Sequence, residues 1–297
     1  MPSFPQKGET TMASDISLTA GMRNNLLSLQ DTSNLIQRTQ GRLSSGKRVN
    51  TPLDNPTNYF AAQGHLQRAS DLSGRKDGMS EAIQMVNAAT AGITGITALI
   101  GSAQGVASAA LATSSFTDRS AYANTFNTLM TQITQLASDS GYRGTNFLTS
   151  GSQTVEFGQT TGSATLGITG FTATAAGLTL TTMTSGSAVA SGSTAWDSSN
   201  ITVGNTAIQC SSGQLESALS EIRRQSSSLS SNLSVVTSRQ SFTNQMINTL
   251  TTGSDNLTLA DMNEEGANML MLQTRQNLGI TSLSMASQAA QAVLQLF

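Results

Sequence analysis

The chain contains one cysteine, Cys210, and one histidine, His65. A disulfide within the chain is therefore excluded, and a zinc site built from Cys and His ligands is disfavoured. Charged residues make up only 11% of the sequence and the formal net charge is −2, so the chain lacks a basic footprint for nucleic acid. Aromatic residues make up only 4%, so Leu, Ile, Met and Ala must fill most of any core.

Targeting signals are also scarce. No continuous run reaches the ~18 apolar residues of a membrane span, so we expect no membrane insertion. The first twenty residues lack the charged start and the apolar core of a secretory signal, so an extracellular protein would leave the cell without a cleaved signal peptide. Residues 1–11, ahead of Met12, are interpreted as an N-terminal extension or a misassigned start.

The polar residues do not converge on a catalytic or metal-binding pattern. Asp261, Glu264 and Glu265 form an acidic cluster, but helix N-termini favour acidic side chains through the helix dipole. Cys210 has no neighbouring His or second Cys to activate it. We therefore expect a protein that is not an enzyme, with no catalytic residues, no metal and no cofactor. A small basic run, Arg38, Arg42, Lys47 and Arg48, is interpreted as a solvated face that could instead pair with the acidic cluster.

Both ends of the chain carry apolar residues at alternating spacings of three and four, the pattern of a coiled-coil seam. Matching patterns at the two ends predict that the first and last helices pair. The predicted seam, which is also a predicted subunit-assembly surface, consists of Met22, Leu26, Leu29, Ile36, Leu43, Met262, Met269, Leu272, Leu283, Ala286, Val293 and Phe297.

Further apolar residues lie off this seam, and a helix that is apolar on several sides is buried on several sides. We expect other copies of the chain to cover this second face. Its predicted members are Leu27, Leu35, Leu270, Leu278 and Leu294, with Met271 and Ile280 also pointing away from the seam.

The interior of the chain repeats the pattern. Two long helical segments predict a coiled coil of the body, with core positions Ile83, Val86, Ile93, Ile100, Leu215, Leu219, Ile222, Leu229, Leu233, Val236, Ile247 and Leu250. Gly92, Gly95, Gly101 and Gly105 interrupt the first segment. They indicate either a frayed helix or a close approach of neighbouring helices, since each costs a helix about 1 kcal/mol relative to Ala.

The predicted fold is mainly α: an elongated helical-bundle or coiled-coil rod of paired terminal helices with a small β-rich central insert. The insert, residues 149–212, is rich in Thr, Ser and Gly, with short strands predicted at Leu178-Thr179-Leu180 and Ile201-Thr202-Val203, low-complexity disorder being the alternative. The predicted order is a tail helix over 12–50 with a linker to about 56, body helices over 57–148, the insert, a body helix over 213–253 broken at Gly253, and a tail helix over 254–297.

Two clusters of motifs resemble bacterial flagellins. The segments Arg42-Leu43-Ser44-Ser45-Gly46, Val49-Asn50 and Asp54-Asn55-Pro56 resemble the family's N-terminal signature, and Gly144-Thr145-Asn146-Phe147-Leu148 resembles a turn at the edge of its body domain. The stretches 272–279, 282–286 and 292–297 resemble its C-terminal signature. The resemblance covers residues 12–148 and 213–297.

This resemblance implies a structural subunit that self-assembles into the extracellular flagellar filament for swimming motility. It further implies export in unfolded form through the flagellar type III apparatus and polymerisation at the distal tip, with the terminal helices in the filament core. The implied partners are other copies of the chain, the export apparatus, a flagellin chaperone, and the hook-associated and filament-cap proteins. A hook–filament junction protein, which has the same terminal helices, is the alternative.

Overall fold

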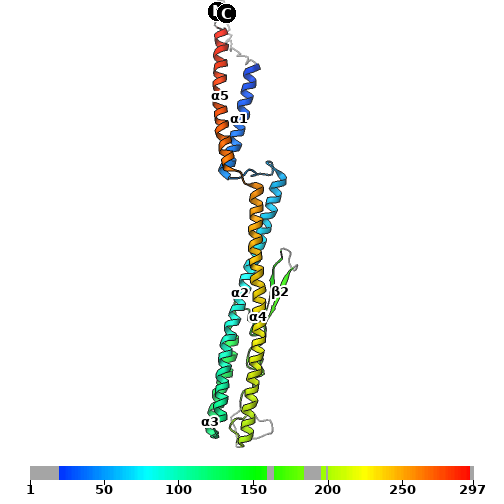
Figure 1. The fold of residues 1–297 in the computed structure, drawn as a ribbon, viewed down its shortest axis with the longest axis vertical. Helices are drawn as coiled ribbons and strands as arrows, with labels where there is room; N and C mark the ends of the chain where they lie inside the picture. Colours follow the sequence, from blue (N-terminus) through cyan, green and yellow to red (C-terminus); the bar gives the residue numbers. More distant parts are fainter. Residues whose placement is uncertain (1–19, 159–163, 184–194, 199, 295–297) are drawn as a thin grey trace, which may run out of the picture. The chain divides into compact units, whose positions relative to one another are not determined.

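The computed structural model describes residues 20–158, 164–183, 195–198 and 200–294. Five helices and one two-stranded sheet make up the described chain (Figure 1). Two compact units are present: a terminal unit, formed by residues 1–64 and 252–297, and a central unit, formed by residues 65–251. The mainly α prediction, with paired terminal helices and a small β element, is confirmed.

The terminal unit is built on helices α1 (Ala20–Ser45) and α5 (Met262–Leu294), which lie side by side (Figure 1). It also contains the first residues of α2 (Pro56–Ala112) and the last residues of α4 (Ile201–Thr258). Asn55 caps α2: its side-chain oxygen accepts a hydrogen bond from the Asn58 backbone N–H at 3.0 Å. Pro56 occupies the first helical position, where its missing N–H costs no hydrogen bond.

The central unit packs α2 and α4 with α3 (Phe116–Asp139) around a large apolar core, and Ala69, Leu72 and Leu250 form a second, smaller cluster between α2 and α4. On α4, every seventh residue from Leu215 is buried: the predicted core positions Leu215, Ile222, Leu229, Val236 and Leu250, and Thr243 between the last two. The interleaved positions Leu219, Leu233 and Ile247 are half-buried. On α2, Val86, Ile93 and Ile100 are buried and Ile83 packs against them half-buried.

Two of the four glycines predicted to interrupt α2 allow a close approach of neighbouring chain. A Cβ on Gly92 would lie 2.6 Å from Ser140 Cβ and 2.7 Å from Leu148 Cδ1, and one on Gly95 would lie 2.7 Å from Leu136 Cδ2. Real Cβ atoms do not come so near, so these two glycines let α3 and the turn after it pack against α2. Gly101 and Gly105 have open space around them, and α2 runs through all four without a break.

Asn146 organises the turn that follows α3. Its side-chain amide donates to the backbone oxygens of Ala137 and Ser138 at 2.8 and 2.9 Å, which satisfies carbonyls at the end of the helix. Its side-chain oxygen accepts from the Leu148 N–H at 2.8 Å. Phe147 and Leu148 are thereby placed in the core.

The β element is an antiparallel hairpin of β1 (Ser152–Glu156) and β2 (Thr165–Thr169), with Val155 opposite Leu166. Val155 and Ile168 point into the core. Two contacts join the hairpin to the long helices. Arg75 of α2 forms an ion pair with Glu156. The guanidinium of Arg239 on α4 lies over the Phe157 ring, 5.5 Å from its centroid.

A buried arginine joins the beginnings of two helices. Arg119 of α3 is almost fully buried; its Nε donates to the Thr113 backbone oxygen at 2.7 Å, and its Nη2 donates to Asn205 Oδ1 of α4 at 2.6 Å. Nearby in the core, Trp196 packs against Phe126 with ring centroids 4.9 Å apart and donates from Nε1 to Ser211 Oγ. Trp196 was not among the predicted core residues, although a single tryptophan in an otherwise polar stretch indicates that this stretch enters the core.

The strands predicted at 178–180 and 201–203 are wrong, as is the break at Gly253. Residues 174–179 form turns. Ile201 begins α4, inside the range predicted as insert, because Asn200 caps the helix by accepting from the Thr202 N–H at 3.0 Å. At the other end, α4 continues through Gly253 to Thr258, since Ser254 and Thr258 are buried there and packing outweighs the cost of one glycine.

By length and composition, α2 is long and apolar enough to cross a membrane, with an 18-residue window of mean hydropathy 1.4. A third of that window is buried within the structure. Ile93, Ile96 and Ile100 of this helix lie in the core of the central unit.

Candidate assembly surface

The terminal unit buries one face of α1 against one face of α5. On α1, Thr32, Ile36 and Thr39 are buried; on α5, Glu265 and Leu272 are buried. Among the predicted seam residues, several lie half-buried around this contact: Met22, Leu29, Leu43, Met269, Leu283 and Ala286.

Two predicted seam residues lie elsewhere. Leu26 and Met262 are exposed in the single chain. Leu26 precedes Thr32, the first buried residue of α1, and Met262 is the first residue of α5 and precedes its first buried residue, Glu265, so both lie outside the fully buried part of the contact. The side chains of Val293 and Phe297, also predicted in the seam, lie outside the described residues.

A glycine brings the two helices close together. A Cβ on Gly279 of α5 would lie 2.7 Å from Leu29 Cδ2 of α1. Leu29 therefore occupies the space that a side chain at position 279 would need. A glycine inside a helix is costly by itself, so its presence here is explained by this contact.

The acidic cluster has structural roles. Asp261 caps α5: its Oδ1 accepts from the backbone N–H groups of Asn263 at 2.8 Å and Glu264 at 3.3 Å. Glu265 accepts from Arg42 Nη1 of α1 at 2.9 Å, which is the pairing of basic run and acidic cluster that the sequence left open. Arg38, Lys47 and Arg48 are exposed, as expected of a solvated face.

Backbone hydrogen bonds join the segment that follows α1 to the segment that precedes α5. Arg48 and Val49 N–H groups donate to the Thr258 backbone oxygen at 2.7 and 3.2 Å, and the Ala260 N–H donates to the Gly46 oxygen at 3.0 Å. Gly46 has a φ of +69°, a conformation that favours glycine. These bonds fix the two ends of the pair against each other.

The opposite faces of both helices carry exposed large apolar side chains. The predicted off-seam residues Leu27, Leu35, Leu270 and Leu278 are all exposed, the last two to 67% and 66%. Met271 and Ile280 are exposed as well. The side chain of Leu294, predicted with them, lies outside the described residues.

The sequence prediction missed four further exposed apolar residues in the terminal unit: Leu53, Phe60, Leu259 and Met285. Leu53 follows Pro52 in a segment interpreted only as a linker. A bulky aliphatic residue in a turn otherwise made of Asn, Thr, Pro and Asp was the available signal.

The described residues that could act as metal ligands or nucleophiles do not cluster. In the part of the chain that the structure describes, no group of three or more His, Cys, Asp or Glu side chains could hold a metal ion. Cys210 lies exposed on α4 and His65 lies half-buried on α2.

Comparisons with known proteins match both ends of the chain. Residues 16–154 match the bacterial flagellin N-terminal helical region, and residues 197–297 match the bacterial flagellin C-terminal helical region. The first match contains α1 and the second contains α5.

Whole-length relatives agree with these matches. Flagellin FljO of Caulobacter vibrioides is 27% identical over 276 residues, 92% of this chain and 94% of its own length. Flagellin FljK of the same organism is 25% identical over 286 residues, 95% of this chain and 98% of its own length. Flagellin C of Rhizobium meliloti is 34% identical over 101 residues, about a third of each chain. The chain therefore belongs to the bacterial flagellins, the structural proteins that polymerise into the extracellular flagellar filament.

Proposed function

We propose that this chain polymerises through the exposed apolar face of its α1–α5 pair, defined by Leu27, Leu35, Leu270 and Leu278. In this proposal the seam between α1 and α5 joins the two ends of one copy, and the opposite face contacts neighbouring copies. The terminal helices then lie in the core of the filament, where water is excluded from both faces.

One observation supports this proposal. Each helix of the pair buries one face against the other helix, and its opposite face still exposes large apolar side chains to solvent. Each fully buried leucine contributes roughly 1.5–3 kcal/mol. Large exposed apolar patches are typical of interaction surfaces. In a homopolymer this contribution recurs in every copy, so a face with only a few buried leucines per copy can stabilise a filament.

Export through the flagellar type III apparatus, in unfolded form and without a cleaved signal peptide, belongs to the same proposal, with growth at the distal tip. A helix pair whose second face is covered only by other copies suits such a route, because the surface becomes buried after delivery. The proposed partners in this route are a flagellin chaperone, the hook-associated proteins and the filament cap.

Electron microscopy of the purified chain under polymerising conditions tests the function. The full chain should form long filaments, and a chain ending at Ala260, which lacks α5, should form none at the same concentration. Short rings or persistent monomers from the full chain would contradict a filament subunit and favour a hook–filament junction protein.

The export route has its own test. Cells lacking the flagellar export apparatus should retain the full-length chain, whereas cells with the apparatus should release it with its N-terminus uncut. Release that does not depend on the apparatus would overturn this part of the proposal and leave polymerisation untouched.

A further inference from the structure

The turn between α1 and α2 holds a leucine almost completely in solvent. Leu53 is 95% exposed. The Asp54 carboxylate accepts from the backbone N–H groups of Asn50 at 3.1 Å and Thr51 at 3.0 Å and from the Thr51 hydroxyl at 3.1 Å. The Asp54 N–H in turn donates to the Thr51 oxygen at 3.1 Å. Four hydrogen bonds thus fix the turn that presents Leu53.

Such a turn is suited to docking. Its backbone is already ordered, so binding loses little conformational entropy there. Its tip, Thr51-Pro52-Leu53, carries no charge. The Asp54 carboxylate next to the tip accepts its hydrogen bonds from Asn50 and Thr51 within the turn, so burial of the tip leaves these hydrogen bonds intact. We refer to this tip as the Leu53 turn.

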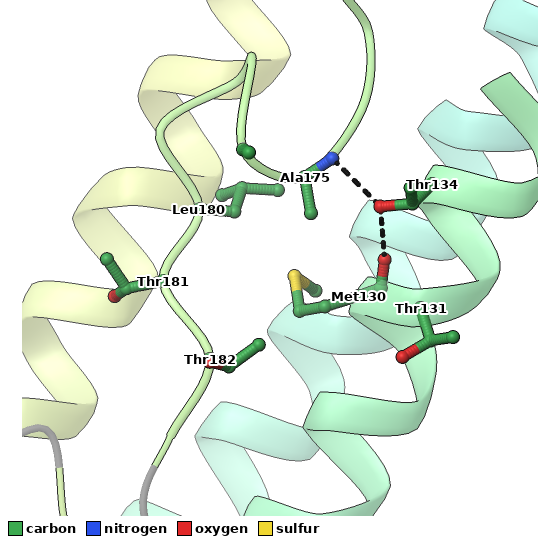
Figure 2. Close-up of a pocket in the computed structure, with 8 residues that line it drawn as sticks. Met130, Thr131, Thr134, Ala175, Leu180, Thr181 and Thr182 are labelled. Atoms are coloured by element: carbon green, nitrogen blue, oxygen red, sulfur yellow. Dashed lines mark hydrogen bonds between the residues drawn. The ribbon is translucent and has the colours of Figure 1, made fainter. Parts of the chain in front are cut away.

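The central unit contains an open pocket of about 630 Å³ between α3 and the segment 175–182 (Figure 2). None of the described residues that line it is charged. Its apolar part comes from Met130 and Thr134 on α3 and from the segment opposite, and its lining includes Ala175, Leu180, Thr181 and Thr182. We call it the threonine-rimmed pocket.

The walls of the threonine-rimmed pocket are held in place. Thr134 Oγ1 accepts from the Ala175 N–H at 3.2 Å and donates to the Met130 oxygen at 3.1 Å (Figure 2). The Thr181 N–H and hydroxyl both approach Gln214 Oε1 of α4, at 3.3 and 3.0 Å. The pocket is therefore present before any partner arrives.

We propose that the Leu53 turn of one copy docks in the threonine-rimmed pocket of a second copy. Both surfaces are uncharged and pre-ordered, one is a projecting apolar side chain and the other an apolar hollow, and the rim hydroxyls can bond the polar atoms beside Leu53. The inference rests on the proposed function, since it requires polymerising copies. Two different surfaces of one chain make a heterologous contact, which repeats from copy to copy and gives an open polymer.

Cysteine cross-linking tests this contact. In a Cys210→Ser background, the double variant Leu53→Cys with Thr182→Cys should give, after polymerisation and mild oxidation, a ladder of covalent multimers on a non-reducing gel. The single variant Leu53→Cys should give none, and unpolymerised double variant should stay monomeric. Only dimers, or no cross-links from intact filaments, would overturn the inference and leave the proposed function standing.

A second variant measures the strength of the contact. Leu53→Ser should raise the critical concentration for polymerisation about tenfold, because a leucine side chain is no longer buried in each contact. Its far-UV circular dichroism as a monomer should not change, since Leu53 contacts solvent. An unchanged critical concentration would contradict the inference. Failure of the unaltered chain to polymerise at all would overturn the proposed function and this inference together.

Discussion

Arg42 and Glu265 form an ion pair that joins α1 to α5, with Nη1 and Oε1 2.9 Å apart. The Glu265 side chain is 9% exposed and the Arg42 side chain 28%. The pair is thus largely withdrawn from water at the end of the terminal unit where both helices meet. Loss of one partner would leave a mostly buried charge without compensation.

Arg42→Met should destabilise the α1–α5 pair more than Arg38→Met, which changes an exposed arginine on the same helix. We expect a loss below the ~3–5 kcal/mol of a fully buried pair, because Arg42 retains contact with water. Adding Glu265→Leu to Arg42→Met should recover most of the loss. Hydrogen exchange of α5 amides in the monomer measures the opening free energy. Equal effects of the two arginine variants would show that the ion pair contributes nothing specific.

Two glycines of α2 offer a matched test of helix packing. Gly92→Ala should lower the melting temperature of the central unit, since overpacking costs about 1–3 kcal/mol and the new Cβ would press on Ser140 and Leu148. Gly101→Ala should raise it, because that position has open space and Ala favours the helix by about 1 kcal/mol. Thermal unfolding followed by circular dichroism gives both values. Stabilisation by Gly92→Ala would mean that α3 does not pack so closely.

The turn at Asp54 should loosen in acid. Backbone hydrogen bonds from Thr51 and Asn50 hold the pKa of Asp54 below its ordinary value of 3.8. Because the pKa is lower in the folded turn, the carboxylate stabilises the turn above about pH 3.8, and this stabilisation is lost as pH falls through the folded pKa.

Carbon-detected NMR titration of the Asp54 carboxyl measures this pKa directly. Exchange of the Thr51 amide should quicken in the same pH range, and Asp54→Asn should abolish that pH dependence. A titration midpoint at or above 3.8 would contradict the hydrogen bonding of the turn.

The body of the fold was largely predictable because its signal is periodic. Every seventh residue of α4 from Leu215 to Leu250 is buried, and a repeat of that length identifies the face of the helix that packs into the core. The off-seam leucines of the terminal helices were predictable for the same reason. Their exposure follows from the geometry of two helices that can cover only one face of each other.

The ends of the helices were less predictable, because they depend in part on contacts with residues far away in sequence. The end of α4 depends on the Thr258 oxygen accepting from Arg48 and Val49, which lie far away in sequence. Its start at Ile201 had a local signal, the capping residue Asn200, which the alternation of Ile201 and Val203 obscured. The exposure of Leu53 follows from side-chain hydrogen bonds of Asp54, which no periodic pattern records.

Two leucines of α5 separate pairing within a copy from assembly between copies. Leu272 is 5% exposed and faces α1, whereas Leu278 is 66% exposed. Leu272→Ser should weaken the helix pair already in the monomer, which hydrogen exchange in α5 would detect. Leu278→Ser should change the stability of the monomer little, because most of Leu278 is already exposed to water there.

The critical concentration of Leu278→Ser for filament growth is the most direct measurement of the proposed assembly surface. If neighbouring copies bury Leu278, the lost ~1.5–3 kcal/mol raises the critical concentration at least about tenfold over the unaltered chain. The monomer's circular dichroism stays the same in that case. Filament growth by Leu278→Ser at the unaltered critical concentration would show that this face of α5 stays in water within the filament, which contradicts the proposal.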